Sequence, residues 1–484
     1  MATAPAGVTG KIVLMDVYAF SSGRQALPSH SYPVEITGYT ATCGFSHPGD
    51  GGEDQNIIAL GGDTTLTNLK MIAKGNTDHN YLSACGHKLV VGNGVTGTAN
   101  SKGRYFKICG GDYRGTFAST DVTVLSGDWY MIYGGNFASG TISGDAKLVV
   151  KDANVTATIE ATYRGTIKGD VYMEIRNTTG EGNVYAGAAS SGKVYGDVTV
   201  VLGENLQKVN VYACASNSTF SGHFTAVADG VDLTKTNIYG RSGSSSVIVP
   251  STLILNQGNL SDVADTFIWR EDATVILGCD QTENAVLASC NLDLNGFDAN
   301  ITVKDGASVT VWDSQTDDYT VEDEAGYGKL TATGNVTAKE GYIAAAGGFH
   351  KFGGQYISSV SLRPQNAGIY YSATVLADEV LMEAMETGVA VSLVDMPTAD
   401  FAADEDTLYA TGTNSVLVQN ILRGNSEDAD RAITDIYAAS FVKLPDGTVL
   451  VSENEVAYSL FDILMLLKEQ NPQAYETFVN TWNK

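Results

Sequence analysis

A repeat of 24 to 27 residues in the middle of the chain constrains the fold more than any other feature of the sequence. Each copy begins with a short apolar stretch that is followed by small residues. The copies begin at Ile108, Ile132, Ile159, Val184, Val211 and Ile238. A unit of this length, with two or three short strands, cannot bury its own apolar face and must stack on the next copy. The sequence therefore predicts a solenoid.

A second signature lies about half a period after the first and consists of alternating apolar and polar residues. Its copies begin at Asp121, Gly144, Gly169, Gly196 and Gly222. A period of two is typical of a β-strand with one buried face. In this register Val198 and Val200 point into the core, and a charge at either position is expected to destabilise the fold.

Short β-rich runs bounded by Gly, Asn or Asp extend the pattern beyond the repeat, and no helical period occurs before residue 370. We therefore expect an all-β solenoid, a right-handed parallel β-helix, over residues 56–362. Residues 1–55 combine a strand-like run with a stretch rich in Ser, Gly, Pro and His. They are expected to form an N-terminal strand and cap, because an exposed terminal coil invites edge pairing.

The composition changes at Arg363-Pro364. Beyond it, residues 378–387, 458–468 and 472–482 have helical patterns, and Pro445-Asp446-Gly447 predicts the turn of a hairpin. Residues 363–484 are therefore expected to form a smaller α+β domain.

The chain carries 55 acidic and 29 basic residues, a net charge of −26. This charge disfavours binding to nucleic acid and docking to anionic membranes, because both need clusters of Lys and Arg. No apolar run approaches the length of about 18 residues that a membrane span needs. The first residues do not resemble a signal peptide. Many Thr, Asn, Gly and Tyr residues with few Lys favour a mature extracellular or cell-surface chain.

The six cysteines contain no CxxC pair, so a zinc ribbon and a thioredoxin-like site are not expected. Cys85 and Cys109 occupy equivalent repeat positions. Stacked strands lie about 4.8 Å apart, a separation that permits a disulfide. Free stacked thiols are an equally open alternative.

Several segments are similar to those of a known group of proteins. They are Thr64-Thr-Leu-Thr-Asn-Leu69, Ala84-Cys-Gly-His-Lys-Leu-Val-Val91, the Gly-Asp-Val coils, Ser361-Leu-Arg-Pro364 with Gly368-Ile-Tyr-Tyr371, and residues 437–452 with Tyr458-Ser-Leu460. The chain resembles secreted or cell-surface parallel β-helix proteins of anaerobic gut Firmicutes, with their recurrent C-terminal module. The resemblance implies an extracellular location and a right-handed parallel β-helix, and it carries no catalytic residues over to this chain.

Four tyrosines share one repeat position, each directly after an apolar residue of the first signature: Tyr133, Tyr185, Tyr212 and Tyr239. Side chains alternate across a strand, so the rings are expected on the outer face. An exposed aromatic stripe could bind the apolar faces of sugar rings. Alternatively, the rings stack on one another and stabilise the coil. Glu160 interrupts the row.

Four aspartates follow the second signature in the same way: Asp121, Asp145, Asp170 and Asp197. They are expected either to cap their own turns through backbone N–H groups or to bind calcium between coils. Calcium is the one cofactor that the sequence raises. A catalytic pair of carboxylates is a third alternative.

Arg114 and Arg164 lie in two copies of Tyr-Arg-Gly-Thr, two coils apart. They are expected either to neutralise an acidic sugar or to pack on Tyr113 and Tyr163. The sequence contains no HExxH, GxSxG or Walker motif. A protein of this composition without such motifs is expected to be non-catalytic.

We therefore expect an extracellular bacterial surface protein, either an adhesin or carbohydrate-binding element or a structural stalk. Its expected partners are glycans or other molecules of a host or bacterial surface. A polysaccharide lyase or glycoside hydrolase of β-helix type is the alternative, because several pectin-active enzymes have this fold.

Overall fold

The structure is a computed structural model that describes residues 9–49, 52, 56–207, 210–242, 249–263, 267, 273–317, 328–345, 347–363, 368–411, 416–418 and 433–482. The chain divides into two compact units. The first comprises Met1–Thr310 with Leu330–Thr337, and the second comprises Val311–Lys329 with Ala338–Lys484. Each unit is described by itself.

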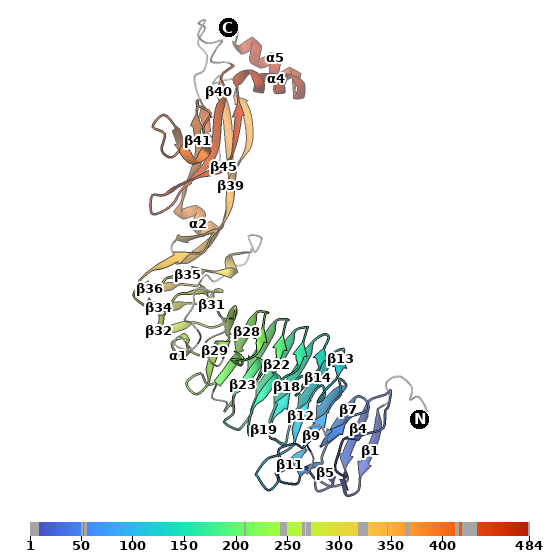
Figure 1. Ribbon diagram of the computed structural model, residues 1–484. Coiled ribbons are helices and arrows are strands. Elements are labelled where there is room, and N and C mark those ends of the chain that lie inside the picture. Colours follow the sequence, from blue (N-terminus) through green and yellow to red (C-terminus); the bar gives the residue numbers. More distant parts are fainter. Residues whose placement is uncertain are drawn as a thin grey trace. The chain divides into compact units, whose positions relative to one another are not determined.

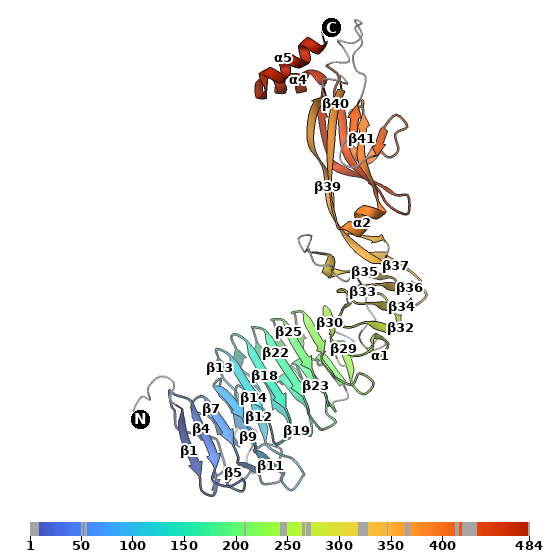
Figure 2. The same cartoon turned by 180° about the vertical axis from the view of Figure 1, so that it is seen from behind.

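The first unit is a parallel β-solenoid, and the described strands make about 11 turns (Figure 1). The coils follow one another in chain order from blue to green, as the view from behind also shows (Figure 2). The strands of one long sheet are, in spatial order, β1 (Gly10–Leu14), β4 (Val34–Gly38), β7 (Thr64–Thr67), β10 (Lys88–Val91), β14 (Thr120–Val124), β18 (Ala146–Lys151), β22 (Val171–Arg176), β25 (Val198–Leu202), β28 (Phe224–Ala228), β30 (Ser251–Leu255), β31 (Ala273–Leu277), β33 (Cys290–Asp293), β35 (Val309–Trp312) and β37 (Val336–Ala338).

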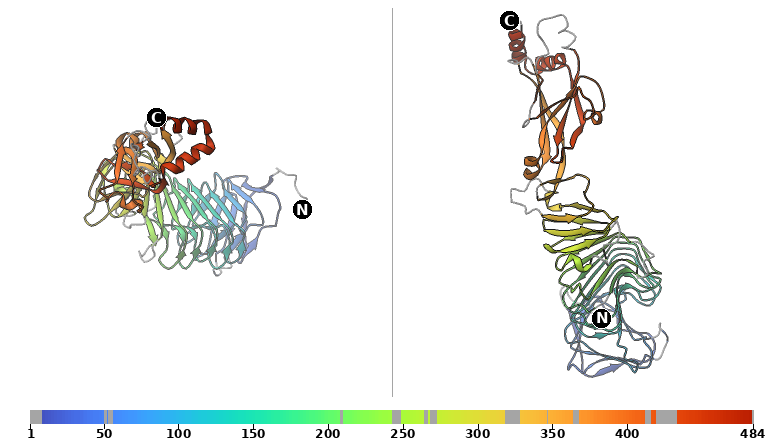
Figure 3. Two further views of the ribbon diagram at one scale, coloured as in Figure 1. Left: turned by 90° about the horizontal axis from the view of Figure 1, so that it is seen from above. Right: turned by 90° about the vertical axis from the view of Figure 1, so that its left-hand side faces the viewer.

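A nine-stranded sheet forms a second side of the coils. Its strands are β3 (Gln25–Ala26), β6 (Ile57–Ala59), β9 (Tyr81–Ser83), β12 (Lys107–Cys109), β16 (Ile132–Tyr133), β20 (Ile159–Thr162), β23 (Val184–Ala188), β26 (Asn210–Cys214) and β29 (Asn237–Ser242). Seen from above, consecutive coils lie side by side (Figure 3).

Shorter sheets complete the coils. Their strands are β2 (Val17–Ala19), β5 (Gly44–His47), β8 (Lys70–Ala73) and β11 (Thr96–Thr98); β15 (Asp128–Trp129) and β19 (Asn154–Val155); β13 (Thr116–Phe117), β17 (Thr141–Ile142), β21 (Thr166–Ile167), β24 (Lys193–Val194) and β27 (Thr219–Phe220); and β32 (Gln281–Leu287), β34 (Ala299–Val303) and β36 (Leu330–Thr333). A short helix, α1 (Leu260–Val263), precedes the last group, and a 3₁₀ helix, η1 (Ser314–Asp317), follows β35.

The core of the solenoid is built from alternate residues of stacked strands. In β22 and β25, Met173 pairs with Val200 and Val171 with Val198, and all four side chains are buried. The predicted inward orientation of Val198 and Val200 is therefore confirmed. The parallel register of the first signature, from β12 to β29, is also as predicted.

Glycine precedes aspartate in the second signature because successive coils approach closely there. A Cβ atom at Gly196 would overlap the backbone carbonyl oxygen of Gly169, and one at Gly222 would overlap that of Gly196. A side chain at these positions would force the coils apart.

The N-terminal segment differs from the cap expected over residues 1–55. Strands β1, β2 and β3 pair in parallel with β4, β5 and β6, so residues 10–47 already belong to the solenoid. The physical reason is register, because Ile12 of β1 continues the inward row of Ile36 and Leu66. Residues 1–8, 50, 51 and 53–55 lie outside the described part of the chain.

The second unit contains two antiparallel sheets. Their strands are β38 (Tyr342–Ala345), β39 (Gly348–Arg363), β40 (Gly368–Ala377) and β43 (Val416–Val418), and β42 (Leu408–Thr411), β41 (Glu386–Ser392), β44 (Ile436–Lys443) and β45 (Val449–Tyr458). The helical segments are α2 (Glu379–Ala384), η3 (Thr398–Asp400), α4 (Leu460–Gln470) and α5 (Pro472–Trp482). The predicted smaller α+β domain is confirmed.

The start of that domain differs from the boundary expected at residue 363. That position is the last residue of β39, which pairs with β40 in one long hairpin, and the unit resumes already at Ala338. Composition changes at the end of β39 rather than at the domain boundary, so the boundary expected from the sequence lies too late in the chain. Among the helices of the described residues, none combines the length and the apolar character needed to cross a bilayer.

Candidate functional site

The outer face of the nine-stranded sheet carries the residues from which a binding site can be built. In strands β12 to β29 the Ile or Val residue of the first signature points into the core, so its neighbours on either side point outward. The register places Tyr185 beside Tyr212 and Tyr212 beside Tyr239. We call these three residues the tyrosine ladder.

The rings of the tyrosine ladder stack face to face. The ring centroids of Tyr185 and Tyr212 are 5.6 Å apart with an interplanar angle of 20°. Those of Tyr212 and Tyr239 are 4.9 Å apart at 11°. All three residues are half-buried, so the ladder supports itself and still reaches solvent. Both alternatives for the row, an aromatic platform and a self-stacked ladder, describe part of this arrangement.

Tyr133 does not belong to the ladder, although the sequence places it in the same row. Glu160 lies between Tyr133 and Tyr185 in the register. The ring of Tyr133 is buried, and its centroid lies 6.1 Å from those of Phe137 and Tyr163. The ring of Tyr133 lies on the outer face of the sheet, as expected, but the neighbouring rings of Phe137 and Tyr163 shield it from solvent.

A second ladder of amides runs beside the tyrosines, two residues earlier in each strand. Asn210 donates from Nδ2 to Oδ1 of Asn183 at 3.2 Å, and Asn237 donates in the same way to Asn210 at 3.2 Å. An amide has two donor hydrogens and an oxygen with two lone pairs, so these amide–amide bonds use only part of the hydrogen-bonding capacity of the three side chains. We call Asn183, Asn210 and Asn237 the asparagine ladder.

Glu160 ends the tyrosine ladder with a buried carboxyl group. The residue is 2% exposed. Thr158 donates its hydroxyl to Oε1 at 2.5 Å, and among the described residues Oε2 has no hydrogen-bond partner. Burial raises the pKa of Glu160 to about 7, although the bond from Thr158 and the charge of Lys107 favour the ionised form. The carboxyl is therefore partly protonated at neutral pH.

Lys107 is the buried cation of this face and is 5% exposed. Its ammonium donates to the hydroxyl of Tyr81 at 3.1 Å and lies 4.9 Å from the centre of that ring. It also lies 5.4 Å from the centre of the Tyr130 ring and 3.8 Å from a carboxylate oxygen of Asp78. Aromatic faces and one carboxylate thus compensate for its lost hydration.

Cys85 and Cys109 are not equivalent as expected, because the register pairs Cys109 with Ser83, two residues before Cys85. Both cysteines are free thiols. Cys109 donates to the carbonyl of Gly135 at 3.1 Å, and Cys85 contacts the guanidinium of Arg24 at 3.5 Å. Burial, together with the carboxylate of Asp112, raises the pKa of both thiols, so both are protonated at neutral pH. Of the two alternatives, a disulfide and free thiols, the structure contains free thiols.

The predicted aspartate row contains three of its four members. Asp145, Asp170 and Asp197 are stacked, and each carboxylate accepts the backbone N–H of the next position in the row, at 2.9, 2.8 and 2.8 Å. The last of these N–H groups belongs to His223, which follows Asp197 in the row as predicted. These N–H groups belong to the next coil, so the expectation that each aspartate caps its own turn is wrong, and the exposed carboxylates link neighbouring coils.

Asp121 does not belong to this row, contrary to the prediction. It pairs in register with Lys88 and Lys147, two residues away from the row, and its carboxylate lies 3.6 Å from the ammonium of Lys88. Within the described ranges, no group of three or more His, Cys, Asp or Glu side chains is placed to hold a metal ion.

Replacing Asp170 by Ala is expected to lower the free energy of unfolding by about 1 kcal/mol, because the N–H of Asp197 loses its acceptor. Asp170→Asn keeps an acceptor oxygen and serves as the control. Urea unfolding with and without calcium measures both effects. Stabilisation by calcium that Asp170→Asn abolishes would contradict the role as a link and favour an ion in the row.

Arg114 and Arg164 are repeat-equivalent, as the pairing of β13, β17 and β21 shows. Each guanidinium lies 4.9 Å from the ring centre of the preceding tyrosine, Tyr113 or Tyr163. Both arginines are exposed. The expected packing on tyrosine is therefore observed, and the rings hold the two charges at the surface.

A further repeat in the sequence indicates part of this face. Asn183, Asn210 and Asn237 recur at the 27-residue period, which indicates a second ladder. In the sequence Glu160 is visible only as an interruption of the tyrosine row, and the repeat does not show that its side chain is buried.

Comparisons with protein-family models, with curated proteins and with solved structures find no match to this chain. The geometry of the nine-stranded sheet is therefore the basis for a functional proposal. Its outer face has stacked rings and amides at one end and a buried Glu160–Lys107 region at the other.

Proposed function

We propose that this chain is an extracellular bacterial surface protein that binds glycans, without catalysis, on the tyrosine and asparagine ladders. The observation that carries the proposal is the pairing of the two ladders on one half-buried face. The outward edges of the stacked rings offer apolar surface to sugars, and amides bind hydroxyl groups as donor and acceptor.

The ligand class follows from repetition and charge. The ladders repeat at the strand spacing of about 4.8 Å, which suits an extended polymer with recurring hydroxyl groups. The net charge of −26 repels polyanions. Neutral glycans, as displayed on a host or bacterial surface, are therefore the favoured partners.

The double variant Tyr185→Ala/Tyr212→Ala is expected to weaken glycan binding at least about tenfold, because interfacial Tyr side chains often dominate binding energy. A glycan array identifies the ligand, and titration calorimetry gives the affinity. Tyr172→Ala and Tyr195→Ala remove exposed tyrosines elsewhere and serve as controls. Equal loss in the controls, or a blank array for the unmodified protein, would leave a structural stalk.

Glu160 gives one observation in favour of the alternative, a glycoside hydrolase or polysaccharide lyase. A carboxyl group that is protonated near pH 7 has the property of a general acid. Glycoside hydrolysis usually needs a second carboxylate. Release of reducing or unsaturated ends from neutral and acidic polysaccharides that Glu160→Gln abolishes would establish the enzyme and overturn the non-catalytic proposal.

A further inference from the structure

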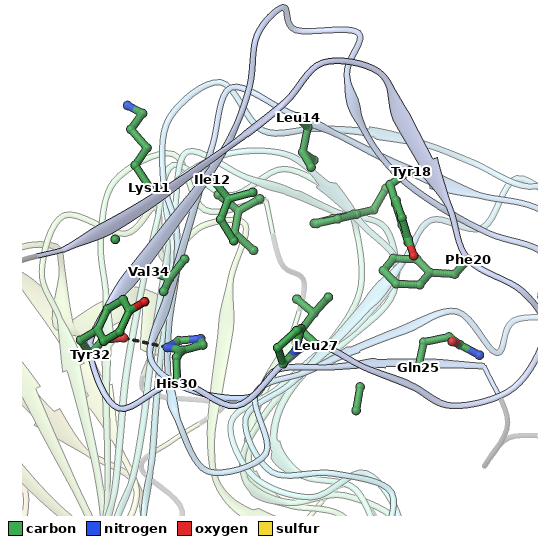
Figure 4. Close-up of a pocket in the computed structure, with 15 residues that line it drawn as sticks. Lys11, Ile12, Leu14, Tyr18, Phe20, Gln25, Leu27, His30, Tyr32 and Val34 are labelled. Carbon is green, nitrogen blue, oxygen red and sulfur yellow. Dashed lines mark hydrogen bonds between the residues drawn. The ribbon is translucent and has the colours of Figure 1, made fainter. Parts of the chain in front are cut away.

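The N-terminal end of the solenoid is an open coil. Strand β1 is the last strand of the long sheet, β2 is the last of its four-stranded sheet, and β3 is the last of the nine-stranded sheet. Their side chains surround a cavity of about 670 Å³ (Figure 4). Ile12, Phe20 and Leu27 are among the apolar residues that line it. Among the residues that the structure describes, none covers the hydrophobic core of the solenoid at this end.

Comparison along the rows shows how much cover this coil lacks. Ile12 is 49% exposed, whereas Ile36 and Leu66, which continue its row, are 5% and 0% exposed. Tyr18 is 58% exposed, whereas its register partner Phe45 is 3% exposed. The same positions are buried one coil later, so a further layer would bury the first coil as well.

The edge of β1 also offers backbone hydrogen bonds. Gly10 donates to the carbonyl of Pro33, and the carbonyl of Leu14 accepts from Tyr39, so the even-numbered residues of β1 bond toward the next coil. Alternation directs the N–H and C=O groups of Lys11 and Val13 toward the open side. A small molecule could fill the cavity, but only a polypeptide strand can also pair with these groups.

The local charge permits contact between two copies of the chain. Residues 9–49 contain Lys11 and Arg24 against Asp16 and Glu35, a balance of zero, in a chain whose net charge is −26. This segment therefore adds no net charge to the self-repulsion expected of so acidic a protein.

We propose that the open N-terminal coil is a dimer interface, in which β1 pairs antiparallel with β1 of a second copy around a two-fold axis. A two-fold interface uses the same patch on both subunits, so the two uncovered cores close each other. Pairing centred on Val13 makes this residue the central hydrogen-bonded pair. In this register Lys11 lies opposite Met15, the apolar residue that follows β1, and not opposite the other Lys11.

Val13→Pro tests the interface without removing a backbone hydrogen bond between β1 and β4. Proline removes the N–H that points to the open side, whereas the bonds to β4 come from the even-numbered residues. Val13→Thr keeps the N–H and a β-branched side chain and is the matched control. The full chain is compared by sedimentation velocity and light scattering over a concentration series.

The unmodified protein and Val13→Thr are expected to be dimers, and the dissociation constant of Val13→Pro is expected to rise at least about tenfold. Circular dichroism and thermal melting of the monomeric variant check that it stays folded. If the unmodified protein is a monomer at every concentration, the proposal is overturned. A dimer of unchanged affinity in Val13→Pro would also overturn it. Glycan binding by Val13→Pro is a separate readout, because the ladders lie on other strands.

Discussion

Val200→Asp is expected to abolish the cooperative folding of the first unit. The side chain of Val200 is fully buried, between Met173 and Ala226 of the neighbouring strands. A carboxylate there loses its hydration without gaining a partner, a cost of more than about 4 kcal/mol. Coils of a solenoid contact only their neighbours, so a defect in a central coil separates the stacks on either side.

Circular dichroism during thermal unfolding measures this loss. Thr199→Asp is the matched control, because Thr199 is adjacent in sequence, lies on the outer face of the same strand and is half-buried. It is expected to cost less than about 1 kcal/mol. An unchanged melting temperature for Val200→Asp would show that the inward and outward faces of the strand are exchanged.

The fold could be predicted because the solenoid repeats one physical pattern. Alternation assigns each side chain to a face, and the row from Ile108 to Ile238 then fixes which strands stack. Asp121 shows the limit of this pattern. A shift by two residues leaves every side chain on its own face, so Asp121-Val122-Thr123-Val124 fits the second signature equally well in two registers.

The candidate site was harder to predict than the fold, because a repeat gives the face of a side chain and not its cover. Tyr133 and Tyr185 occupy one row, yet one is buried and the other is half-buried. The difference comes from Phe137 and Tyr163, which lie outside the strands and pack beside Tyr133. Similarly, the open first coil could not be predicted from the repeat, because it depends on which strands end the stacked sheets.

Glu160→Gln is expected to change how stability depends on pH. Burial raises the pKa of Glu160 from its ordinary value of 4.5 to about 7 in the folded protein. Between these two values the folded state holds a proton that the unfolded chain has released. The free energy of unfolding of the unmodified protein therefore falls as the pH rises through this window, by about 3 kcal/mol in total, and the contribution is constant above it.

Glutamine does not ionise, and it keeps an oxygen that accepts the hydroxyl of Thr158. Its side chain resembles the protonated form of Glu160, so the two proteins should be similarly stable near pH 4.5, and the variant should be more stable at pH 8. Urea unfolding at several pH values measures the difference, in which the titration of all other groups cancels. Glu181→Gln, at an exposed position of the same unit, is the control. Parallel curves for the unmodified protein and Glu160→Gln would mean that the carboxyl group is ionised or solvated in the folded state, and the hydrolase alternative would then lose its general acid.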